Sequence, residues 1–102
     1  MDTIPAEEFR AQAGADGWRA DDDGARIDFA TGDFATGARL FAAIAELAEQ
    51  ANHHPDVDVR YSRVGVHLFT HSAGGLTHKD VELANRISAT AEELGIPVDG
   101  ES

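Results

Sequence analysis

The chain has 102 residues, 42% of them hydrophobic, which predicts a single domain with one buried core. Asp and Glu number 19 against eight Lys and Arg, so the formal net charge is −11 and the surface would repel the phosphates of a nucleic acid. The absence of cysteine excludes disulfides and cysteine-based metal or redox sites, and no apolar run approaches the roughly 18 residues of a membrane span. With no signal-peptide pattern at its start, we expect a cytoplasmic protein that binds neither membranes nor nucleic acids.

The amino-terminal third favours a short helix followed by a pair of short strands. Pro5 suits the first turn of a helix, which is predicted over Ile4–Ala13. Strands are predicted over Trp18–Ala20 and Ala25–Phe29, because an Asp-rich turn ending at Gly24 separates these two stretches.

A long helix is predicted next. Asp33 is a typical N-cap residue, and apolar side chains then recur at three- and four-residue spacing. Pro55 disfavours a helical conformation at His54, so the helix should end near Asn52 or His53. The stripe expected to face the core comprises Phe34, Ala38, Phe41, Ile44, Ala48 and Ala51, widened by Leu40 and Leu47.

From Val57 the hydrophobic period changes to two, which predicts a β-hairpin that turns near Ser62 and Arg63. A last helix is predicted to begin at Thr77 and to end before Gly95. The alternating strand residues are Val57, Val59 and Tyr61, then Val64, Val66 and Leu68, and the buried stripe of the helix is Val81, Ala84, Ile87, Ala91 and Leu94.

This order of elements predicts an α+β fold: a four-stranded antiparallel sheet with helices packed on one face. We expect one domain over residues 1–102, with a core at about 5–95 and a frayed tail over 96–102. The free face of so small a sheet is often covered by a second subunit.

Two histidines stand side by side at His53 and His54, and three roles compete for them: metal ligands, acid and base groups, or unrelated surface residues. Adjacent side chains diverge rather than chelate. His67 and His71 would lie ~13 Å apart along a strand, too far for one ion to bridge. A metal site assembled from distant residues stays open, but no spacing in the chain supports one.

An acid and base role suits the ends of elements at which these histidines are predicted. His53 would lie at a helix C-terminus, and His71 just beyond a strand beside a Gly-rich loop, a natural rim for a pocket. Histidine is the side chain best matched to proton transfer near neutral pH. Glu49 precedes His53 by one helical turn and either holds its imidazole or forms an ordinary surface pair. Asp80 fits a helix capping box, and Tyr61 is expected to be packed.

Read together, these residues resemble the pattern of the pterin-4a-carbinolamine dehydratases. That pattern sets a charged residue, a histidine pair with proline, an aromatic residue, a further histidine and an aspartate at fixed intervals, and the resemblance covers roughly residues 5–95. Several parts at set spacing make a far more specific signal than a lone His-His-Pro. The matching residues are Glu49, His53, His54, Pro55, Tyr61, His71 and Asp80.

The resemblance implies a hydro-lyase that dehydrates 4a-hydroxytetrahydrobiopterin to the quinonoid dihydropterin during tetrahydrobiopterin recycling. It implies that His53 and His71 transfer the protons, with the acid and the base not yet assigned between them. His54 would position the pterin. The residues implied to bind the substrate or shape the site are Glu49, Pro55, Tyr61 and Asp80. Neither a metal nor a bound cofactor is implied, since the pterin is the substrate, and the expected assembly is a homodimer or homotetramer.

A non-catalytic binding or assembly factor on the same fold is the alternative. Relatives in the family serve as dimerisation cofactors of a homeodomain transcription factor or as assembly chaperones of a carbon-fixing enzyme. A chain kept only for binding need not retain His53, His54 and His71 together, so the histidine set favours catalysis.

Overall fold

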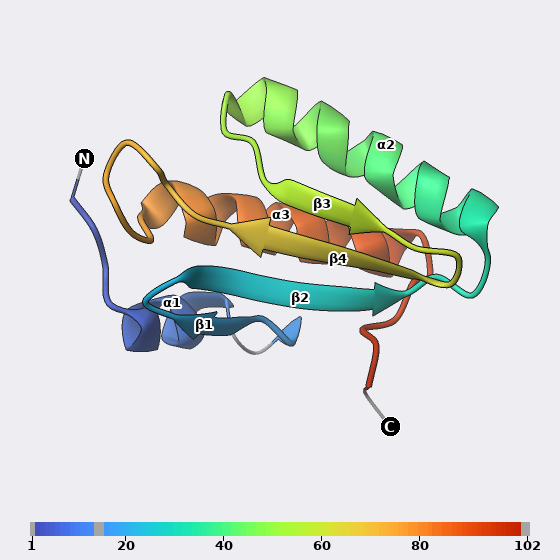
Figure 1. The fold of residues 1–102 in the computed structure, drawn as a ribbon, viewed down its shortest axis with the longest axis horizontal. Helices are drawn as coiled ribbons and strands as arrows, with labels where there is room; N and C mark the ends of the chain where they lie inside the picture. Colours follow the sequence, from blue (N-terminus) through green and yellow to red (C-terminus); the bar gives the residue numbers. More distant parts are fainter. Residues whose placement is uncertain (1, 14–15, 101–102) are drawn as a thin grey trace.

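A four-stranded antiparallel sheet backed by three helices forms the described part of the molecule (Figure 1). The computed structural model describes residues 2–13 and 16–100. The strands lie in the order β1-β2-β4-β3 and every neighbouring pair is antiparallel, so the predicted α+β class is confirmed. The elements are α1 (Ala6–Ala13), β1 (Arg19–Asp21), β2 (Gly24–Ala30), α2 (Phe34–Ala51), β3 (Asp56–Val59), β4 (Arg63–Leu68) and α3 (His78–Glu93).

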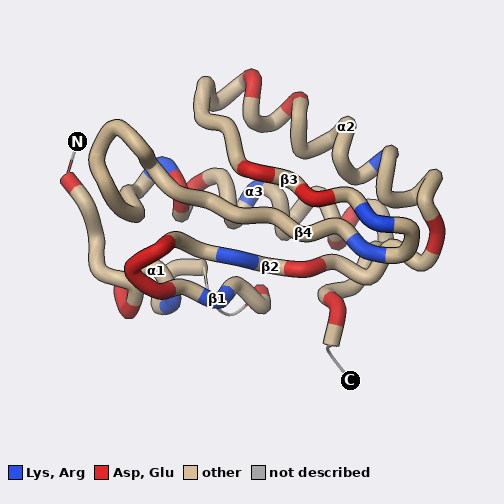
Figure 2. Tube along the Cα trace, viewed as in Figure 1, with Lys and Arg blue, Asp and Glu red and all other residues tan. Residues whose placement is uncertain are grey.

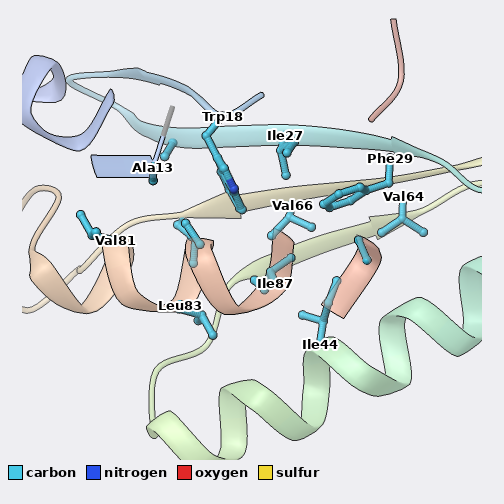
Figure 3. Close-up of a cluster of buried hydrophobic side chains, with 14 of the residues drawn as sticks. Ala13, Trp18, Ile27, Phe29, Ile44, Val64, Val66, Val81, Leu83 and Ile87 are labelled. Carbon is cyan, nitrogen blue, oxygen red and sulfur yellow. The ribbon is translucent and has the colours of Figure 1, made fainter. Parts of the chain in front are cut away.

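The two central strands supply the sheet's half of the core. Along β4 the side chains of Val64, Val66 and Leu68 are buried, as their period-two pattern predicts. β2 alternates in the same way, and its Ile27 pairs with Val66 across the ladder. The helices lie on this apolar face, and the core fills the space between them and the sheet (Figure 3). The predicted packing of helices on one face is therefore confirmed.

The long helix α2 buries only part of the predicted stripe. Phe34 and Phe41, both expected in the core, are 56% and 44% exposed. The predicted stripe is wide, and hydrophobic periodicity alone does not say which side of it meets the sheet. One reason for the outcome is Gly37, where a Cβ would lie 3.4 Å from Val64, so that this small residue lets the helix approach β4 closely. The residues that face the core are Gly37, Leu40, Ile44 and Ala48.

The last helix agrees with its prediction at the start and departs from it at the end. Thr77 is the N-cap of α3 and forms a capping box with Asp80, as expected. Leu94 is 48% exposed rather than buried, because the helix ends there and Gly95 turns the chain with a φ of +72°. The other predicted residues, Val81, Ala84, Ile87 and Ala91, are buried together with Leu83.

The segment after α3 is held against β2, where a frayed tail was expected. Backbone hydrogen bonds of 2.9 and 2.8 Å join residues 97–99 to residues 28–30 of β2. β1 pairs only with residues 24–26 of that strand, which leaves the rest of the β2 edge open to the returning chain. The expectation of fraying is therefore wrong for these residues, and its last positions, 101–102, lie outside the described residues.

Asp33 caps α2, and its carboxylate accepts a hydrogen bond from the backbone amide of Thr36 at 2.7 Å. That amide, and then the Thr36 side chain, holds the pKa of Asp33 below its ordinary 3.8. Such a carboxylate adds stability above its unfolded-state pKa and loses it as the pH falls through the lower folded-state value.

We expect Asp33→Asn, which keeps a capping oxygen but no charge, to be less stable than the wild type at neutral pH. The difference in unfolding free energy should shrink as the pH is lowered from about 5 to about 3. Urea unfolding across this range measures it, and a difference that does not change with pH would contradict the assignment.

Candidate active site

The turn between α2 and β3 sends the two adjacent histidines in different directions. Asn52 takes the left-handed conformation, φ 49° and ψ 43°, as the C-cap of α2, and the amide of His53 donates to the Ala48 carbonyl at 3.1 Å. Pro55 precedes the first residue of β3. The predicted helix end is confirmed, and His53 and His54 find partners on different helices.

His53 contacts a fully buried carboxylate. Its Nε2 lies 2.6 Å from Oδ1 of Asp80, which is 27 residues further along the chain in the first turn of α3. The side chain of Asp80 is 0% exposed and that of His53 only 11%, so water competes little for this contact. The pair joins the end of α2 to the start of α3.

The second oxygen of Asp80 is satisfied from within the protein. Oδ2 accepts a hydrogen bond from the Thr70 hydroxyl at 2.7 Å and another from the Thr77 backbone amide at 2.9 Å. The hydroxyls of Thr70 and Thr77 lie 2.9 Å from each other. Asp80 therefore caps α3, as predicted, and at the same time connects the end of β4 to His53.

These contacts distinguish the two nitrogens of His53. A carboxylate only accepts hydrogen bonds, so the contact with Asp80 places the ring proton on Nε2. In the neutral imidazole the free lone pair then lies on Nδ1. Nδ1 is therefore the ring nitrogen left free to accept a proton, while Asp80 holds the ring through Nε2.

Glu49 pairs with His54 and not with His53, contrary to expectation. Oε2 of Glu49 contacts Nε2 of His54. The reason is the left-handed Asn52, which takes the chain out of the helical path, so that the four-residue spacing no longer places His53 above Glu49. Both side chains of the pair are more than half exposed, so the contact orients His54 but adds little stability.

His71 follows Thr70 in the loop that leads from β4 to α3. A tight turn closes this loop: the amide of Gly74, whose φ is +73°, donates to the Thr70 carbonyl at 3.0 Å. The His71 side chain is exposed, and its ring lies edge-on to Phe69 with 5.1 Å between the ring centroids. This loop and the α2–β3 turn lie at the same end of the molecule (Figure 1). His71 is thus one residue away from the hydrogen-bond network that holds His53.

Two cavities open beside the histidine pair, and His71 lines neither of them. The first, of about 200 Å³, lies between the end of α2 and α3, and His53 contributes to its wall. The second, of about 310 Å³, is mainly apolar and is lined by His54, Glu49 and Pro55 together with residues of α2 and β3. The α2–β3 turn therefore stands between two separate cavities, with one histidine facing each.

Tyr61 lies far from the two histidines of the α2–β3 turn. It lies in the turn between β3 and β4, at the opposite end of the molecule from the α2–β3 turn (Figure 1), and is 74% exposed. The prediction that it is packed is therefore wrong, and its role in shaping the site stays a prediction. β3 runs away from the histidines at ~3.3 Å per residue, and Tyr61 follows its far end.

Thr70 is the site residue that sequence reasoning did not single out. It continues the inward alternation of β4 beyond Leu68 and is 5% exposed. A polar side chain at an inward position of a strand needs a partner in the interior. That position was the signal in the sequence that could have found it.

The remaining histidines stay outside the site. His67 lies 2.8 Å from the carbonyl oxygen of Asp23, and His78 is exposed beside Glu8. Within residues 2–13 and 16–100, no three His, Cys, Asp or Glu side chains are grouped so that they could hold a metal ion. No helix in the described part of the chain has the length and apolar character needed to cross a bilayer.

Comparison with known proteins decides the family. The model of the family described as Pterin 4 alpha carbinolamine dehydratase matches residues 2–90. The chain belongs to the pterin-4a-carbinolamine dehydratase family. A provisionally named pterin-4-alpha-carbinolamine dehydratase of Acidobacterium capsulatum is 51% identical over 57 residues, which are 56% of this chain and 62% of that protein. Another, of Thermomicrobium roseum, is 39% identical over 75 residues, which are 74% of this chain and 81% of that protein.

A solved structure supports the fold of this pterin dehydratase family member. The transcriptional coactivator/pterin dehydratase of Brucella melitensis superimposes with a TM-score of 0.80 at 32% identity, over 88% of this chain and 99% of that one. The resemblance seen in the histidine pattern is thus confirmed at the level of family and fold.

Proposed function

We propose that this member of the dehydratase family removes water from a 4a-hydroxytetrahydropterin in the cytoplasm and so returns the quinonoid dihydropterin to tetrahydropterin recycling. The observation that carries the proposal is the contact between His53 and the buried carboxylate of Asp80. Asp80 also accepts a hydrogen bond from Thr70, the residue before His71, so His71 is one residue away from this network. Family membership supports the choice of a pterin as substrate.

Loss of water from this substrate needs two proton transfers. An acid protonates the hydroxyl oxygen on C4a, and the C4a–O bond breaks as water leaves. A base removes the proton of N5, whose electron pair forms the new double bond to C4a. We assign the two transfers to His53 and His71, because imidazole both donates and accepts protons near neutral pH.

The geometry supports separate roles within the site. Asp80 accepts from three protein donors, so it is a positioning residue that leaves Nδ1 of His53 available for the transfer. We assign His54, which Glu49 orients, to positioning the pterin ring at the α2–β3 turn.

Dehydration of a synthetic 4a-hydroxytetrahydropterin, followed by ultraviolet absorbance, tests this function. We expect turnover well above the spontaneous rate and no effect of a chelator, since proton transfer by histidine needs no ion. No acceleration by folded protein, in either low or high salt, would refute the proposal, and a chelator-sensitive rate would replace it with metal-dependent chemistry.

Protein binding is the second candidate, and an apolar surface on α2 favours it. Phe34 and Phe41 are exposed and lie seven residues apart, which places them on one side of the helix. The Brucella melitensis relative is described as a transcriptional coactivator as well as a pterin dehydratase. A binding role would survive replacement of His53, His54 and His71 by alanine, whereas dehydration would not, so one triple variant separates the two functions.

We further infer that this α2 surface packs against a second copy of the chain in a homodimer or homotetramer. Phe41→Asp would bury a charge in that contact, so it should shift the oligomer toward monomer in light scattering. Leu94→Asp is the matched control, because Leu94 is 48% exposed at the end of α3. The oligomer of this variant should have the same mass as the wild-type oligomer. A monomeric wild type at working concentration, or an unchanged mass for Phe41→Asp, would contradict the inference.

A further inference from the structure

Two of the eight cationic side chains in this acidic chain have no partner among the residues that the structure describes. The side chains of Lys79 and Arg86 form neither a hydrogen bond nor an ion pair with any other residue that the structure describes, although acidic residues number 19 and occur along most of the fold (Figure 2). The other cations each contact a carboxylate, a carbonyl or a hydroxyl, and they are Arg10, Arg19, Arg26, Arg39, Arg60 and Arg63.

Both unpartnered cations line the cavity of about 200 Å³ that His53 also lines. They lie seven residues apart on one side of α3, with Glu82 between them, and Gln50 of α2 forms part of the wall as well. One carboxylate against two cations leaves this wall with a net positive charge, in a chain whose formal net charge is −11.

A cavity of this kind is matched to an anionic group. The guanidinium of Arg86 offers paired donors that suit a carboxylate or phosphate, and the ammonium of Lys79 adds a point charge. The net negative charge of the rest of the molecule disfavours anion binding at other positions, so an anion should bind preferentially at this cavity. The tetrahydropterin ring system carries no negative charge of its own, which places the anionic group on its side chain.

We propose that Lys79 and Arg86 bind a phosphate or carboxylate on the side chain of the pterin substrate while His53, on the same cavity, faces the ring. The identification of the substrate as a pterin rests on the proposed function, and the anionic group is inferred from the charged residues that line the cavity. The substrate class is then a 4a-hydroxytetrahydropterin with an anionic side chain, preferred over one with a neutral side chain.

Calorimetric titration with two stable oxidised pterins tests the proposal. The probes are 6-hydroxymethylpterin and its phosphate ester, which differ only in the anionic group. We expect the wild type to bind the ester about tenfold more tightly, the size of two partly exposed charge contacts. The variant Lys79→Gln/Arg86→Gln should lose this preference, and added salt should weaken it in the wild type. The control Arg39→Gln/Arg60→Gln makes the same change of charge away from the cavity and should keep the preference.

Four results would overturn the inference. Equal affinity of the wild type for the two pterins, or an undiminished preference in Lys79→Gln/Arg86→Gln that is folded by circular dichroism, would remove the role of these cations. Inorganic phosphate binding as tightly as the ester would make the cavity a site for free anions only. Binding and dehydration of neutral pterins without any preference would leave the proposed function standing, whereas failure to bind either pterin would end both.

Discussion

His71→Ala is expected to lower kcat/KM for dehydration by about 10²- to 10⁴-fold, the usual contribution of one positioned acid or base. The reason is the place of His71, one residue beyond the Thr70 hydroxyl that is bound to Asp80 and through it to His53. The His71 side chain is exposed, so alanine removes the imidazole without opening a cavity and the fold should persist. Ultraviolet absorbance at substrate concentrations below KM measures the change.

Two further variants sharpen this test. His78→Ala removes an exposed imidazole whose nearest acidic partner, Glu8, is 3.8 Å away, and it should leave kcat/KM unchanged. If His53 and His71 are the acid and base of one step, the double variant His53→Ala/His71→Ala should lose little more than either single variant. A wild-type rate in His71→Ala would remove this residue from the chemistry.

Asp80→Ala is expected to lower the free energy of unfolding by about 3 to 5 kcal/mol, as removal of one member of a buried polar pair does. The substitution leaves the Thr70 hydroxyl, the Thr77 amide and the His53 imidazole without their common acceptor. Buried donors without an acceptor carry their full desolvation cost. Denaturant unfolding followed by circular dichroism gives the value.

An exposed carboxylate provides the control for this prediction. Asp58 contacts Arg60 at 2.9 Å, but the side chains are 63% and 65% exposed, so Asp58→Ala should cost less than about 1 kcal/mol. The loss of stability for Asp80→Asn should fall between those of the two alanine variants. The amide oxygen of the asparagine still accepts from Thr77, but its NH₂ group faces another donor, either Thr70 or His53. A loss for Asp80→Ala as small as that for Asp58→Ala would show that the network adds no stability.

The elements that could be predicted are those whose signals are local. Thr77 and Asp80 are three residues apart and form the capping box that starts α3, and the residues after them repeat with the helical period. The alternation in β4 likewise identifies Val64 and Val66 as core residues without reference to any other strand. In both cases the residues that determine the conformation are close neighbours within the same helix or strand.

The candidate site was predictable in its members and not in its contacts. The pattern of residues pointed to His53, His54 and His71, and the structure places all three at one end of the molecule (Figure 1). It did not indicate that His53 contacts Asp80, 27 residues away, or that Glu49 turns to His54. These pairings depend on how the end of α2 meets α3 and on a single left-handed residue between them.

The sequence by itself determined the elements, the acidic surface and the set of histidines, because each follows from residue types and short-range spacing. Only the tertiary structure decided which residues of the wide apolar stripe of α2 are buried, which carboxylate holds His53, and that residues 97–99 pair with β2. The physical reason is that periodicity reports the angle of a side chain about its own axis. The residue that this side chain contacts depends on the distance and crossing angle of a second element. Both are fixed only when the core packs.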